Sequence, residues 1–139
     1  MKDLSIESGI ENYSLNGSYE LTFNPTDSAF VERLFSTFDG LDSKQESYKA
    51  EVEKLGDRRE IFAVARKRDA EMREMIDGAL GAGCCAAVFG TMNVYALAKG
   101  LPVWANLLLA VIDEIDTTFA REQKATNPRL EKYLKKYRK

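Results

Sequence analysis

The adjacent cysteines Cys84 and Cys85 are the residues of this chain best suited to nucleophilic or redox chemistry. Neighbouring cysteines rarely bridge each other, because the ring they would close is strained. A thiolate at a helix start would be reactive, but buried packing is the interpretation we favour, because free cysteines are among the most buried residues. The sequence has no histidine, which is the usual general base and zinc ligand. We therefore predict no catalytic residue and no enzyme.

Two further motifs resemble ligand sites without completing one. Gly81-Ala82-Gly83 precedes a predicted helix, where backbone N–H groups can bind phosphate, but it lacks the preceding strand and the lysine of a P-loop. Asp113 and Asp116 share one face of a predicted helix, yet no further carboxylates complete a divalent-cation site. We expect a tight corner and a solvated helix face, with no cofactor and no metal.

Charge is distributed unevenly along the 139 residues, although the net charge is only -2. Residues 1–41 contain seven acids against two bases, whereas residues 129–139 contain six bases against one acid. This polarity would let copies meet head to tail or let a monomer clasp its own tail; the plain alternative is that both ends are solvated surface.

The start Met1-Lys2-Asp3 predicts no signal peptide, and the apolar run 101–112 is too short to span a bilayer.

Residues 10–23 predict a β-hairpin, because alternating apolar residues flank Asn16-Gly17. A three-residue loop would pair Leu15 with Tyr19 and Tyr13 with Leu21, and so gather the apolar side chains on one face. A helix should follow from Thr26 or Asp27 and end at Asp39-Gly40. Its aromatic stripe contains Phe30, Leu34 and Phe38.

Residues 42–77 are rich in charge and carry apolar residues seven apart, namely Tyr48, Leu55 and Phe62. We favour a single long helix of coiled-coil character, about 54 Å long if unbroken, whose seam needs a partner. The alternative is that Gly56 ends one helix and Asp57 caps the next, so that the halves pack on each other.

Glycines punctuate the chain from Gly78 onward. Short helices are predicted at 84–89 and 94–99, and Pro102 should open a helix of about twenty residues that Asn127-Pro128 ends. The basic tail then forms a short amphipathic helix.

Together these elements predict a mostly α fold with an N-terminal β-hairpin packed on a helical domain. The domain has one long charged helix and a C-terminal helical subdomain. We divide this single folding unit into residues 1–41 (hairpin and aromatic helix), 42–80 (long charged helix), 81–128 (helical subdomain) and 129–139 (basic tail).

The segment 69–90 resembles a stretch of the small tail assembly chaperones of long-tailed bacteriophages. The shared features are a helix ending in Ile76-Asp77, then Leu80-Gly81, a short loop, and a short helix closing with Phe89-Gly90. The opening segment 23–27 and the basic, tyrosine-bearing end 132–137 fit the same family. Leu80 stands where phenylalanine is expected, and Cys84-Cys85 is not part of the pattern.

The resemblance implies a non-enzymatic chaperone in the bacterial host cytoplasm that binds and solubilises the tape measure protein, with the tail-tube protein as a second partner. The predicted partner-binding residues are apolar, and the tail is expected to mediate homo-oligomerisation. Partner binding is assigned to Phe30, Leu34, Phe38, Tyr48, Leu55 and Phe62, and self-association to Lys132, Tyr133, Lys135, Lys136 and Tyr137.

Two alternatives stay open at this point. One is a helical adaptor or structural subunit whose seam forms a stable homo-oligomer. The other is a nucleic-acid-associated protein that uses its basic tail, which the sequence pI of about 5.3 argues against. No membrane contact is expected.

Overall fold

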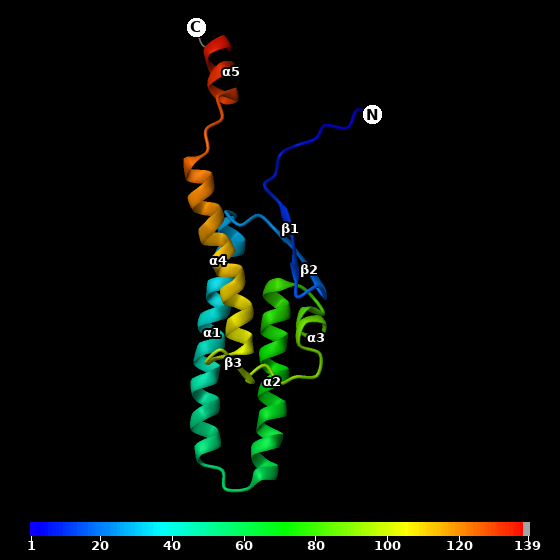
Figure 1. The fold of residues 1–139 in the computed structure, drawn as a ribbon, viewed down its shortest axis with the longest axis vertical. Coiled ribbons are helices and arrows are strands. Elements are labelled where there is room, and N and C mark those ends of the chain that lie inside the picture. Colours follow the sequence, from blue (N-terminus) through cyan, green and yellow to red (C-terminus); the bar gives the residue numbers. More distant parts are fainter. Residues whose placement is uncertain (138–139) are drawn as a thin grey trace.

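The computed structural model describes residues 1–137 and shows a mostly helical protein with an antiparallel β-hairpin near its N-terminus (Figure 1). The predicted fold class is confirmed. The elements are β1 (Glu11–Leu15), β2 (Tyr19–Phe23), α1 (Ser28–Glu53), α2 (Arg58–Leu80), α3 (Cys84–Phe89), β3 (Leu97–Ala98), β4 (Leu101–Pro102), α4 (Val103–Lys124) and α5 (Arg129–Tyr137).

The hairpin adopts the predicted register, with Leu15 opposite Tyr19 and Tyr13 opposite Leu21. Asn16 and Gly17 both take positive φ angles of 52° and 72° in its loop. The Ser14 hydroxyl accepts the Gly17 N–H at 3.1 Å and stabilises this turn. Because side chains alternate along a strand, the apolar face of the hairpin is directed onto the helical core.

The prediction that the aromatic helix ends at Asp39-Gly40 is wrong, because α1 continues through Gly40 to Glu53. Leu34 and Leu41 are both fully buried, so one packing face extends across the glycine. A Cβ at Gly40 would lie 2.9 Å from the Met75 Cε of α2. The glycine therefore permits close helix contact, which offsets its low helix propensity of about 1 kcal/mol relative to alanine. The proposed boundary at residue 41 falls inside one helix.

The favoured single helix over residues 42–77 is also wrong, and the alternative break at Gly56 is correct. The chain leaves α1 at Lys54 and re-enters a helix at Arg58, where the Asp57 carboxylate accepts the Arg59 N–H at 3.0 Å. The two helices fold back on each other as a helical hairpin (Figure 1). Two ion pairs join the helices, one between Arg68 of α2 and Glu51 of α1 and one between Lys44 of α1 and Glu71 of α2. The seam of the charged region thus finds its partner inside the same chain.

The predicted helix over 94–99 is wrong as well, because these residues form a loop and the small hairpin β3–β4. Asp69 of α2 accepts the Val94 N–H at 2.8 Å, and the Asn93 side chain donates to the Ala65 carbonyl at 3.1 Å. These bonds hold the loop against α2 and leave Val94 fully buried. Tertiary contacts therefore replace the local helix here.

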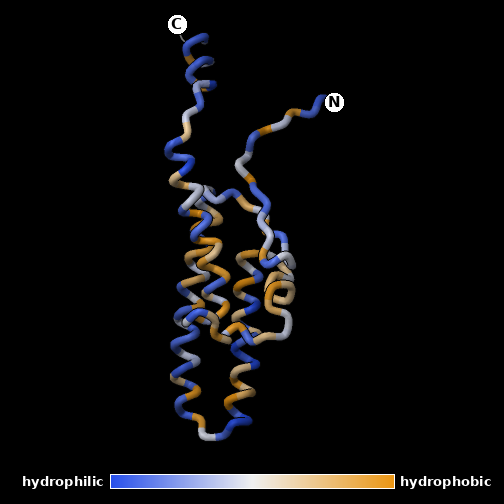
Figure 2. The backbone as a smooth tube through the Cα atoms, viewed as in Figure 1, coloured by the Kyte–Doolittle hydropathy of each residue, from blue (hydrophilic) through white to orange (hydrophobic). Residues whose placement is uncertain are grey.

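The core lies where the hairpin, α1, α2, α3 and α4 meet, and the hydropathy colouring places many apolar residues in this region (Figure 2). Phe23 stacks on Phe30 with ring centroids 4.3 Å apart. Trp104, the single tryptophan, is 2% exposed and donates its Nε1–H to the Gln45 side chain at 2.7 Å. Long α4 begins just after Pro102, close to the prediction. In the described part of the chain no helix combines the length and the apolar character needed to cross a bilayer.

Candidate apolar groove and helical tail

The six predicted partner-binding residues do not form one exposed surface. Phe30 and Leu34 are buried in the core at 6% and 0% exposure, so we correct their assignment from partner contacts to core residues. Phe38 is half-buried against Trp104, with ring centroids 5.5 Å apart. The aromatic stripe of Phe30, Leu34 and Phe38 therefore packs inside the molecule, where α1 meets the hairpin and α4.

The outer part of the predicted seam follows the α1–α2 hairpin toward its tip. Tyr48 stacks on Tyr95 at 4.5 Å between ring centroids, and Leu55 is half-buried at the inter-helix turn. Phe62 is 57% exposed. Among the six residues, Phe62 is therefore the one that presents most of its ring to solvent.

An apolar groove that the sequence did not predict lies between the hairpin tip, α3 and α4. It has a volume of about 420 Å³. Its apolar lining comes from four elements and the loop after α3, and consists of Leu15, Val88, Phe89, Met92, Ala98, Val103, Leu107 and Ala110. Met92 is 49% exposed, whereas Leu107 is 7% exposed and forms part of the floor. We call this surface the apolar groove.

The groove continues along α4 into a smaller hollow between α4 and β1. Ser14, Leu15 and Ala110 line both cavities, and Glu114 lines the second. The α4 residues that face the groove follow a helical spacing from Val103 to Glu114, which corresponds to about 16 Å of helix. The apolar surface is thus long enough to accept a helix of two to three turns.

The Tyr13 side chain lines the smaller hollow that continues the apolar groove, and its hydroxyl lies at an acidic end. It lies 2.6 Å from Glu11 Oε2 and 3.2 Å from Glu114 Oε1, so one phenol proton serves two carboxylates. Burial, and then the hydrogen bond to Glu11, raises the pKa of Tyr13 above its usual range. Arg121 pairs with Glu11 at 3.2 Å. The local excess of carboxylates makes this end attractive to a cation.

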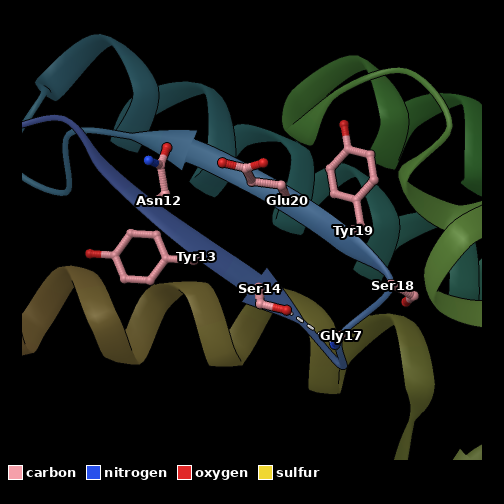
Figure 3. Close-up of a pocket in the computed structure, with 7 residues that line it drawn as sticks. All are labelled: Asn12, Tyr13, Ser14, Gly17, Ser18, Tyr19 and Glu20. Atoms are coloured by element: carbon pink, nitrogen blue, oxygen red, sulfur yellow. Dashed lines mark hydrogen bonds between the residues drawn. The ribbon is translucent and has the colours of Figure 1, made fainter.

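A third cavity, of about 440 Å³, lies over the hairpin itself (Figure 3). It is lined mainly by small polar residues, together with Tyr13, Tyr19 and Glu20. Figure 3 shows Tyr13 beside α4 and Tyr19 extending toward the segment that joins α2 and α3, where its hydroxyl lies 3.4 Å from the Ala82 carbonyl. The tyrosines thus tie the hairpin to the helices, and no reactive group converges on this hollow.

The two cysteines that could have carried nucleophilic or redox chemistry are packed in the core. Cys84 and Cys85 are buried at 0% and 1% exposure. Burial and the nearby Asp77 raise the pKa of the Cys84 thiol to about 11 and that of Cys85 further. The Asp77 carboxylate accepts the Cys85 N–H at 2.9 Å. Both thiols are therefore protonated near neutral pH, which disfavours nucleophilic chemistry.

The glycine motif forms the tight corner between α2 and α3. Gly81 and Gly83 have φ angles of 136° and 77°, and a side chain at Gly81 would clash with the Tyr19 hydroxyl. Over residues 1–137 the structure contains no group of three or more acidic or cysteine side chains arranged to hold a metal ion. Asp113 and Asp116 lie on the exposed side of α4.

The basic tail is the helix α5, and it lies apart from the folded body (Figure 1). Its apolar face is uncovered, with Leu130 69% and Tyr137 72% exposed. The predicted self-association residues Lys132, Tyr133, Lys135, Lys136 and Tyr137 are all exposed on this helix. Arg138 and Lys139 of the predicted tail lie outside the described residues.

Comparison of the chain with protein-family models, curated proteins and solved structures found no match.

Proposed function

We propose that this protein is a non-enzymatic tail assembly chaperone that binds the tape measure protein in the bacterial host cytoplasm and keeps it soluble. The tail-tube protein is proposed as its second partner. The observation that carries the proposal is the apolar groove, which has partly exposed walls and an almost buried floor. Of the motifs that resemble those of phage chaperones, Ile76-Asp77 lies in the last turns of α2, and Phe89, which ends α3, lines this groove.

An apolar groove of this shape suits an amphipathic helix of a client. Such a helix would place side chains spaced three and four residues apart into the groove, while its polar face stays in water. A long helical client exposes many such segments, which would aggregate if left uncovered. Several chaperone copies, each bound weakly, would cover the client and still dissociate when the tail tube assembles.

Phe62 supplies a second apolar contact at the far end of the α1–α2 hairpin. A single exposed phenylalanine is common on protein surfaces. We therefore assign it a supporting role, in which the hairpin rests on a more distant turn of the same client.

The proposal is tested by light scattering from a fragment of the tape measure protein encoded in the same genome, with and without this protein. Ala110 is exposed on α4 and lines the groove, so Ala110→Arg fills the groove with a bulky charged side chain. Ala120→Arg is the matched control, because Ala120 is exposed on the same helix and lies outside the groove.

We expect the wild-type protein and Ala120→Arg to suppress aggregation of the fragment to the same extent. Ala110→Arg should need at least about tenfold more protein for the same effect, which corresponds to 1.4 kcal/mol. Equal protection by both variants would move the client site away from the groove, and no protection by the wild-type protein would overturn the proposed function.

A further inference from the structure

The tail helix α5 has an apolar face that no other part of the described chain covers. Its apolar face is formed by Leu130, Tyr133, Leu134 and Tyr137, and each is at least 40% exposed. Over residues 129–137 the hydrogen bonds that α5 makes beyond its own helix go only to Asn127 and Pro128 in the preceding linker. A nine-residue helix without tertiary contacts is marginal in water, so this segment gains stability when its apolar face is covered.

The apolar groove matches α5 in length. The groove and the smaller hollow that continues it follow about 16 Å of α4, and nine helical residues span about 14 Å. The apolar side chains of α5, which are spaced three or four residues apart, would face Leu107 and Met92. The lysines of α5 would then lie at the rim of the groove.

Charge also matches between the two surfaces. Glu11 and Glu114 converge on the Tyr13 hydroxyl at one end of the groove, where Arg121 offsets one of the two negative charges, and residues 129–139 contain six bases against one acid. Opposite charges at the rim would orient the helix and speed its capture.

Within its own chain the tail can reach only the Glu114 end of the groove, about 15 Å along α4 from Lys124, and it cannot fill the rest. Leu107 lies about 26 Å along α4 from Lys124, where the helix ends. The linker 125–128 reaches at most about 18 Å when fully extended, and Tyr133 lies about 6 Å further along α5. The centre of the tail therefore falls short of Leu107, even before it crosses the 8–10 Å that separate packed helix axes.

We propose that α5 of one copy docks in the apolar groove of a second copy, so that copies associate head to tail. Such a contact is heterologous, because it joins two different surfaces and leaves one free groove and one free tail at the ends of each chain of copies. The tail would cover the groove when no client is present, and a client helix would have to displace it. This inference concerns the groove alone and does not require that the client be a tape measure protein.

Sedimentation velocity of the full chain over a range of concentrations tests the proposal, after nuclease treatment to remove nucleic acid. Leu134→Asp disrupts the tail face, and Thr126→Asp is its control, because it adds the same charge in the exposed linker. Ala110→Arg blocks the groove, and Ala120→Arg is the control on α4.

The wild-type protein and both controls should show a mass that rises with concentration. Association should weaken at least tenfold in Leu134→Asp and in Ala110→Arg, and by about the same factor in the wild-type protein when salt is raised from 0.1 M to 1 M. Circular dichroism of each variant checks that the fold is intact.

Mixing the two defective variants gives the sharpest outcome. One retains an intact groove and the other an intact tail, so the mixture should form a one-to-one pair and nothing larger. A monomeric wild-type protein, association that persists in Ala110→Arg, association that nuclease abolishes, or a mixture that does not pair would each overturn the proposal. These outcomes are independent of whether the protein protects a tape measure fragment.

Discussion

The loss of folding stability in Leu34→Ala, compared with that in Phe62→Ala, tests which of the predicted partner-binding residues belong to the core. Leu34 is fully buried on α1, within the cluster that joins the hairpin and the helices. Leucine-to-alanine changes at such sites cost about 3 kcal/mol, because they remove buried methyl groups and leave a cavity. A domain of this size has a stability of roughly 5–15 kcal/mol, so Leu34→Ala should remain folded but much weaker.

Phe62→Ala is the matched comparison, because Phe62 was predicted as part of the same partner surface but is 57% exposed. Its truncation should cost less than about 1 kcal/mol, since most of the ring already contacts water. Urea unfolding followed by the fluorescence of Trp104 measures both values, because this single tryptophan is buried in the core.

The two variants should differ in unfolding free energy by about 2 kcal/mol or more. For a domain of this length, that difference corresponds to a melting temperature roughly 8 °C lower for Leu34→Ala than for Phe62→Ala. The two variants losing equal stability would refute the division between core and surface. The same conclusion would follow if Phe62→Ala were the more damaging change.

Other predictions follow from individual contacts. Asp57→Ala removes the N-cap of α2 and should cost about 1 kcal/mol in urea unfolding; an unchanged midpoint would contradict this role. The buried thiols of Cys84 and Cys85 keep their protons in the folded state, whereas unfolded cysteines lose them near pH 8.5. Stability should therefore fall as pH rises from about 8.5 to about 10, below the range in which tyrosines titrate, by up to about 1.4 kcal/mol per pH unit for each thiol, and a double alanine variant should lack the slope in this range. Asp69→Ala removes the acceptor of the Val94 N–H, so hydrogen exchange at that amide should accelerate; unchanged protection would show that other contacts hold the loop.

Local patterns predicted the hairpin and the last long helix well. Asn16-Gly17 between alternating residues specifies one register, because only a three-residue loop brings Leu15 and Tyr19 to the same face. Pro102 marks the start of α4 because proline favours the first turn of a helix. In both cases the residues that decide the structure are adjacent in the sequence.

The errors occurred where distant contacts decide the structure. Gly40 remains helical because Met75, 35 residues later, packs against it. Val94 leaves the helical conformation because Asp69 on another helix accepts its N–H. The seven-residue spacing of Tyr48, Leu55 and Phe62 describes a helix-packing seam in either a projecting helix or a hairpin, so the spacing alone could not decide between them.

The candidate site was predicted only in part. Sequence reasoning identified the amphipathic tail, because its apolar stripe and lysines are contiguous. It missed the groove, whose lining comes from Leu15, Phe89, Met92 and Leu107 on separate elements. The signal available in the sequence is the apolar cluster of Val88 and Phe89 at the end of the short helix and Met92 just after it.

Methionine methyl NMR can show whether the client binds in the groove, because the chain carries one methionine in the groove and another in the core. Met92 lines the groove at 49% exposure, whereas Met72 is fully buried. Addition of a helical tape measure fragment should shift or broaden the Met92 methyl signal and leave the Met72 signal unchanged. A fragment that binds while Met92 stays unperturbed would contradict the account.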